Sequence, residues 1–234
     1  MRNIPFPVWR LMLAYSLMMA GTSMVVLIAG IIGVAMAPTA AVATLPVALA
    51  VVGLASSTLP TGKLLARFGR NKVFRAYAVL AIGSALFASA SLAHASFAGF
   101  CLASFMMGWA TAAGHQYRFA ALEAVPAHLA PKAISALLLG GLLGAFVGPE
   151  LAVRGRWLLE TEFAGSFLLL AAAYLVGLFI ISSHRDSKHF APIHAGNSGR
   201  PIGVILRSPA VLLAVGASGI AYGVMSLIMS ATPI

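Results

Sequence analysis

Polar side chains inside long apolar stretches are the most informative residues of this 234-residue chain, because polarity at membrane depth is costly and marks functional sites. The densest group is His115-Gln116-Tyr117-Arg118, and helical periodicity puts Trp109 and Gln116 on one face. Two further apolar stretches carry polar and aromatic residues, namely Tyr15 with Thr22 and Tyr222 with Ser226. Such surfaces can bind a flat or amphipathic organic solute by aromatic contact and hydrogen bonding.

The same residue types also anchor helix ends at a membrane surface. For Arg118 the anchoring and the solute-binding interpretations stand equal. Trp109 lies in the middle of its apolar stretch, so a binding surface or a packed core suits it better than an anchor.

The sequence contains no recognisable set of catalytic residues. Gly216-Ala217-Ser218-Gly219 matches the G-x-S-G pattern of intramembrane serine proteases, but the last histidine, His194, precedes it, so the required later base is missing. The histidines at 184, 189 and 194 are five apart, which is not the one-face spacing of a helical metal site. We therefore expect no enzyme activity, no cofactor and no metal.

The elements that position the polar residues are membrane helices. The composition is 61% hydrophobic and 9% charged, whereas soluble chains carry about 25% charged residues. A helix crosses hydrocarbon in about 20 residues, so the charge-free stretches predict seven spans. They are expected near 11–36, 41–62, 76–93, 97–117, 133–149, 163–183 and 209–232. The predicted fold class is all-α, a polytopic membrane helix bundle.

Basic residues between these spans predict the orientation of the chain. Of the 15 lysines and arginines, only Arg154 and Arg156 fall on one side, and the other 13 fall on the opposite side. Cytoplasmic loops carry the excess of Lys and Arg, so the N-terminus is expected in the cytoplasm. We expect an integral protein of a bacterial inner membrane that contacts the lipid bilayer. No basic aromatic face lies outside the loops, so nucleic acid is not an expected partner.

The segment Gly62-Lys63-Leu64-Leu65-Ala66-Arg67-Phe68-Gly69-Arg70-Asn71-Lys72 resembles the signature loop between helices two and three of the major facilitator superfamily. Ala66 replaces the acid usual in that pattern. The alternative is an ordinary positively charged cytoplasmic loop. The resemblance implies that these residues, with Glu123, form a cytoplasmic gate: Gly62, Arg67, Gly69, Arg70 and Lys72.

Two later segments extend the resemblance. Glu123-Ala124-Val125-Pro126 and the following Lys132 are similar to the family's connection into helix five, which implies that Glu123 pairs with Arg67 or Arg70. A surface ion pair worth about 0–1 kcal/mol is an equal alternative. In the fifth span, glycines recur every fourth residue and can let a neighbouring backbone approach closely. They are Gly140, Gly144 and Gly148, the last followed by Pro149.

The resemblance also implies the domain organisation. It gives an N-terminal six-helix half at 1–183 built from inverted three-helix repeats, a cytoplasmic linker at 184–208, and the first helix of an incomplete second half at 209–234. Helices one, four and seven would line a central cavity. The expected function is alternating-access transport of a small organic solute, with the missing C-terminal half as a partner. The alternative is a non-transporting membrane scaffold or accessory subunit.

Overall fold

The computed structural model describes residues 5–182 and 207–231, with side chains as far as Met225, and this part of the chain consists of helices joined by short turns. The membrane-length helices are α1 (Phe6–Met36), α2 (Leu45–Phe68), α3 (Arg70–Ala93), α4 (Phe97–Glu123), α5 (Ala130–Gly155) and α6 (Ala164–Ser182). The seventh helix is α8 (Pro209–Ala231), and short 3-10 turns lie at Ala40–Val42 and Ala127–Leu129. The all-α prediction is confirmed.

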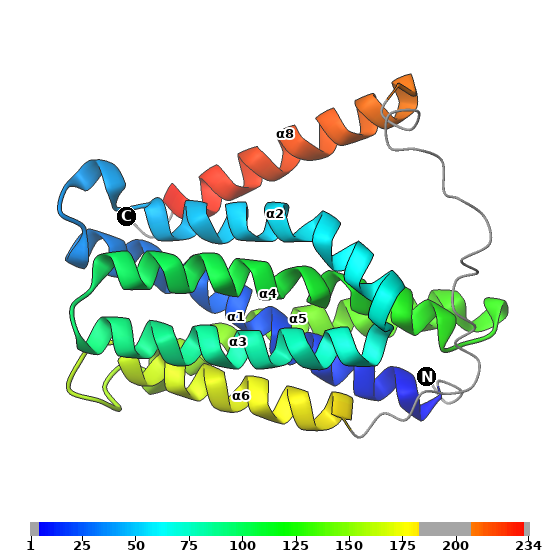
Figure 1. Ribbon diagram of the computed structural model, residues 1–234, viewed down its shortest axis with the longest axis horizontal. Helices are drawn as coiled ribbons and strands as arrows, with labels where there is room; N and C mark the ends of the chain where they lie inside the picture. The colour runs from blue at the N-terminus through cyan, green and yellow to red at the C-terminus, as the bar shows by residue number, and fades with distance from the viewer. Residues whose placement is uncertain (1–4, 183–206, 232–234) are drawn as a thin grey trace. The chain divides into compact units, whose positions relative to one another are not determined.

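The chain forms two compact units, Met1–Phe190 with α1–α6 and Ala191–Ile234 with α8. In the first unit all six helices are long and apolar enough to cross a membrane, and α8 contributes a shorter apolar stretch, Pro209–Met225. Figure 1 shows successive turns of the six-helix unit at alternate ends, as consecutive membrane spans require. The linker predicted at 184–208 lies outside the described residues except for its last two positions.

The segment predicted as a loop at 62–72 is helical except at one residue, which corrects the prediction. Helix α2 continues through Gly62 to Phe68, and α3 begins at Arg70. Only Gly69 interrupts the helices, with φ +80°, a conformation that glycine adopts without a steric cost. The basic residues around it therefore project from two helix ends that meet at a tight corner.

Helix pairing within the six-helix unit has an internal symmetry. The most extensive contacts join α1 to α5, α2 to α4 and α3 to α6, and α3 also packs on α4 while α1 packs on α6. If α1 is exchanged with α4, α2 with α5 and α3 with α6, the same set of helix pairs results. The expected three-plus-three repeat thus agrees with the observed packing.

Small residues bring the paired backbones together. Along α5, Gly140, Gly144 and Gly148 lie against the α1 carbonyl groups, and a methyl group at Gly144 would be 2.5 Å from the Ser16 oxygen. The Ser23 hydroxyl of α1 donates to the Gly144 carbonyl at 3.0 Å. Between α2 and α4, Gly53 and Gly108 make equally close backbone approaches.

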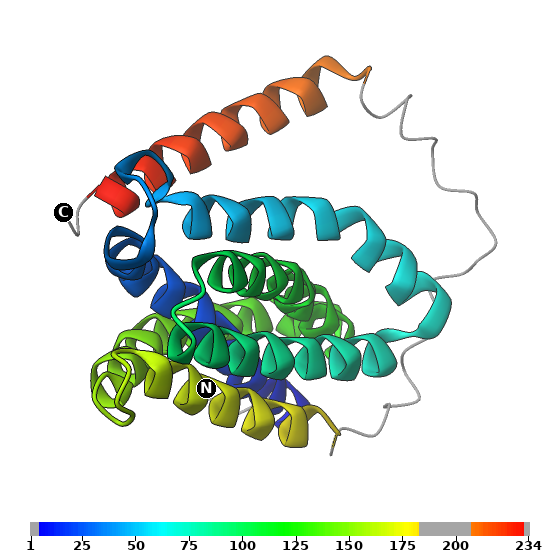
Figure 2. The same ribbon diagram turned by 60° about the vertical axis from the view of Figure 1, so that its left-hand side comes forward.

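Helix α2 contains an internal proline, Pro60, which cannot donate the usual backbone hydrogen bond. Figures 1 and 2 both show α2 bent toward its C-terminal end. The nearby Ser57 hydroxyl donates to the Trp109 carbonyl of α4 at 3.1 Å, and Thr61 donates to the Ser57 carbonyl at 2.7 Å. Polar side chains thus tie the bent part of α2 to its neighbour.

The Gly144 contact predicts a selective loss of stability. Gly144→Ala should lower the free energy of unfolding by about 1–3 kcal/mol, because the added methyl group overpacks a backbone contact. Unfolding of the purified chain can be followed by the reaction of the buried Cys101 thiol with a maleimide dye. Gly83→Ala in α3 is the matched control, since a methyl there meets nothing within 4 Å. Equal melting temperatures for the two variants would contradict the close α1–α5 packing.

Candidate functional site

Arg118 in α4 and Tyr15 in α1 form the contact at the centre of the candidate site. The Arg118 guanidinium donates to the Tyr15 hydroxyl at 3.1 Å and lies 6.0 Å from the centre of the Tyr15 ring. Tyr15 is 3% exposed and packs edge-on against Tyr117, with ring centres 6.4 Å apart. Tyr117 in turn contacts Phe74 of α3 at 4.5 Å. A cluster of three aromatic rings therefore fixes the hydroxyl that orients the arginine.

Arg118 has no carboxylate within salt-bridge distance among the described residues, whose three ion pairs involve other arginines. A guanidinium carries five N–H donors, and Tyr15 takes one of them through a neutral hydroxyl. Arg118 is exposed, so its remaining donors can reach oxygen atoms of a solute, a lipid headgroup or water.

The other predicted cavity residues of the six-helix unit occupy different positions. His115 and Gln116 are half-buried on the same turn of α4, and Trp109 is half-buried further along, with Phe105 beside it at 5.9 Å. Thr22 is exposed on α1. Thus Tyr15 and Arg118 are brought into contact, and Thr22 and Trp109 lie farther along their helices. His115, three residues before Arg118, shares its side of α4, whereas Gln116, two residues before it, faces a different side.

Two predicted residues lie in α8, in the second unit of the chain. Tyr222 is 44% exposed there. Ser226 lies outside the part of the chain whose side chains are described. Their contribution to a shared cavity stays a prediction.

The basic corner between α2 and α3 contains the predicted ion pair, formed by Arg70 and Glu123. It joins the first residue of α3 to the last residue of α4. Arg67 does not take this partner and instead lies 5.2 Å from the ring of Phe68. Lys72 is exposed, and Arg75 donates to the Ser182 carbonyl at the end of α6 at 3.2 Å. Arginines thus connect α3 to the ends of both α4 and α6.

A buried polar network in α2 and α3 was missed by the sequence interpretation. The Thr61 and Tyr77 hydroxyls are 2.7 Å apart, and both side chains are buried. The signal was present as Ser57 and Thr61, spaced one helical turn apart around Pro60 in an otherwise apolar span. This network joins α2 to α3 in the half of α2 that leads to the basic corner.

The chain is similar to known membrane proteins. The model of the Major Facilitator Superfamily matches residues 11–234. The riboflavin transporter RfnT of Brucella anthropi is 35% identical over 228 residues, which cover 96% of this chain and 57% of that protein. The chain therefore spans little more than half the length of this relative. No solved structure matches the chain.

The Arg70–Glu123 pair should contribute little to the free energy of unfolding. Its side chains are 19% and 35% exposed, so a double-mutant cycle of Arg70→Ala and Glu123→Ala should give a coupling of about 0–1 kcal/mol. The measurement is denaturant unfolding of the four chains in micelles. The exposed pair Arg154–Glu150 provides the matched control cycle. A coupling of several kcal/mol would show a permanent structural bridge and not a contact that can open.

Proposed function

Because the chain belongs to the major facilitator superfamily, we propose that it supplies the first six helices and the seventh helix of an alternating-access transporter. We further propose a flat heteroaromatic solute, with riboflavin as the leading candidate. The similarity to a riboflavin transporter over 96% of this chain supports that choice. As part of this proposal, a second half completes the cavity, the N-terminus is cytoplasmic and the membrane is the bacterial inner membrane.

The Arg118–Tyr15 contact carries the proposal for the binding site. The isoalloxazine ring of riboflavin is planar and bears two carbonyl oxygens, so it can accept hydrogen bonds from a guanidinium and stack on aromatic faces. Arg118 retains free N–H donors, and Tyr15 fixes its direction. His115, half-buried on the same side of α4 as Arg118, can donate to or accept from the polar ring edge or the sugar-alcohol chain, and Gln116 would contact the solute from the α4 face that it shares with Trp109.

The remaining sequence candidates take supporting roles in the proposal. Trp109 offers a further aromatic surface on α4 and Thr22 a hydroxyl on α1, while Tyr222 and Ser226 stay candidates on α8. Arg70 and Glu123 close the cytoplasmic end by pairing across α3 and α4. Opening that end would require breaking a partly exposed pair, which should cost little.

Helices α2 and α5 supply the surface for the second half in this proposal. They are the least buried of the six spans, with 22% and 33% of an 18-residue apolar stretch buried, against 50% or more in the others. Each is held to its partner by the close glycine contacts on one face, which leaves the opposite face open. In this proposal, the open faces of these two spans contact the second half of the transporter.

A chimera tests this function directly. This chain would replace the aligned segment of the Brucella anthropi riboflavin transporter in a bacterium that depends on imported riboflavin. We expect riboflavin uptake, and Arg118→Gln should reduce it by about 10-fold to 100-fold, the equivalent of one lost charged hydrogen bond.

Arg154→Gln is the matched control, because Arg154 pairs with Glu150 at the other end of the six-helix unit and should leave uptake unchanged. A chimera that reaches the membrane folded but moves no riboflavin would count against the proposed solute. Full uptake by Arg118→Gln would count against the site.

A further inference from the structure

The connection between α5 and α6 holds three consecutive large apolar side chains away from the protein. Trp157 is 70% exposed, Leu158 57% and Leu159 41%. The sequence interpretation used this connection only to count its arginines. Exposed apolar groups of this size usually mark a contact surface.

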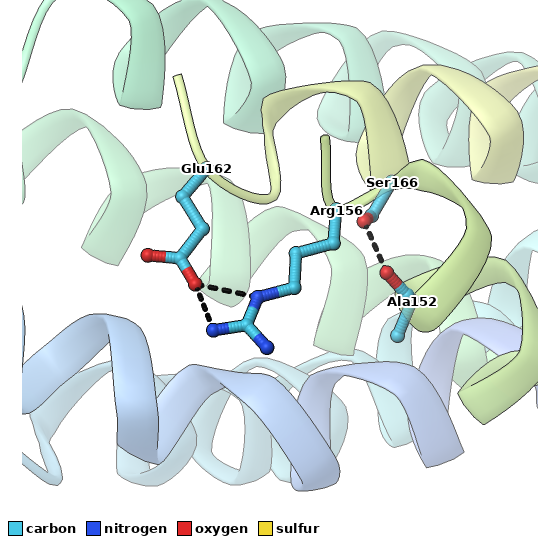
Figure 3. Close-up of polar contacts among 4 residues, drawn as sticks. All are labelled: Ala152, Arg156, Glu162 and Ser166. Atoms are coloured by element: carbon cyan, nitrogen blue, oxygen red, sulfur yellow. Dashed lines mark hydrogen bonds and ion pairs between the residues drawn. The ribbon is translucent and has the colours of Figure 1, made fainter. Parts of the chain in front are cut away.

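Side-chain contacts fix the loop that presents them. Figure 3 shows two of the three Arg156 guanidinium nitrogens, Nε and Nη2, reaching the same carboxylate oxygen of Glu162, at 2.6 and 2.5 Å. The Arg156 guanidinium also lies 5.0 Å from the Trp157 ring centre and 5.2 Å from that of Phe163. The Phe163 amide donates to the Arg156 carbonyl at 3.0 Å, which closes the loop at its base.

The base of the loop is equally constrained. The buried Ser166 hydroxyl of α6 donates to the Ala152 carbonyl of α5 at 2.7 Å, also visible in Figure 3. Gly155 lies directly against the Ser166 backbone, and no side chain would fit there. Phe163 adopts a φ of +64°, an unfavourable angle for a residue with a side chain. The loop therefore presents its apolar tip in one defined direction.

The adjoining spans set the depth of this tip in the membrane. Between Lys132 and Glu150 no residue is charged, which at the helical rise is about 25 Å and close to the hydrocarbon thickness. Helix α6 begins at Ala164 and runs for 19 residues without a charge. The tip at residues 157–159 follows the charged end of one span and precedes the start of the other, so we expect it at headgroup level.

We propose that Trp157, Leu158 and Leu159 form a lipid anchor that inserts into the boundary between headgroups and acyl chains. Tryptophan is enriched at this depth because its ring is apolar and its N–H is polar. The neighbouring charges are already paired, Arg156 with Glu162 and Arg154 with Glu150. With these pairs and Glu160, the segment carries no surplus positive charge, so insertion should depend on apolar contact and not on anionic lipid.

Fluorescence of Trp157 in vesicles tests the anchor. The chain with Trp9→Phe and Trp109→Phe retains Trp157 as its single tryptophan and is reconstituted into phosphatidylcholine vesicles. Bromine near the headgroup end of the acyl chain should quench the emission about twofold or more, and bromine near the chain terminus should quench it less. Raising the share of anionic lipid or the salt concentration should leave the quenching unchanged.

A matched variant that also carries Leu158→Ser and Leu159→Ser should show weaker lipid quenching and stronger quenching by aqueous iodide. In both variants the buried Cys101 thiol must stay unreactive before heating, which shows that the bundle is folded. Quenching of Trp157 by iodide and by neither brominated lipid would overturn the proposal. Protection from both reagents would also overturn it, because protein would then cover the tip.

Discussion

A hydrocarbon layer about 30 Å thick admits almost no charge, and the layout of this chain follows from that constraint. Charged residues gather at helix ends, which fixes where each span begins and stops. Lipid also removes the hydrophobic driving force between helices, so close contact must come from small residues. The glycines of α5 against α1, and those at the α2–α4 crossing, meet this requirement with backbone-to-backbone approach.

The same constraint suggests different roles for Arg70 and Arg118, because they differ in their position along the helix and in their partners. Arg70 begins a helix at the membrane edge and is neutralised by Glu123. Arg118 lies about a turn and a half inside the end of α4, and its contacts are the hydroxyl and ring of Tyr15. A paired arginine at a helix end can hold that end closed. An arginine that rests on a neutral tyrosine can bind the oxygens of a solute, and the proposed transport function depends on this difference.

The sequence predicted the spans well because charge-free stretches report the thickness of hydrocarbon directly. It predicted helix ends less well, since a helix can continue into the headgroup region with charged residues on it. Helix α2 therefore runs to Phe68 and α4 to Glu123, beyond the predicted span ends. The resemblance identified Glu123 and two possible partners, but only the corner at Gly69 decides between Arg67 and Arg70. The Tyr15–Arg118 bond joins residues 103 positions apart, so only the helix packing shows it.

The central claim is that the arginine-rich end of the six-helix unit faces the cytoplasm and the α3–α4 connection faces outward. Single-cysteine variants test it in a Cys101→Ala background, with Ala66→Cys in α2 near the basic corner and His94→Cys after α3. Both positions are exposed, so each thiol can react. A membrane-impermeant maleimide applied to intact cells should label position 94, and position 66 only after permeabilisation. Labelling of position 66 in intact cells, with position 94 protected, would contradict the orientation and the cytoplasmic gate that depends on it.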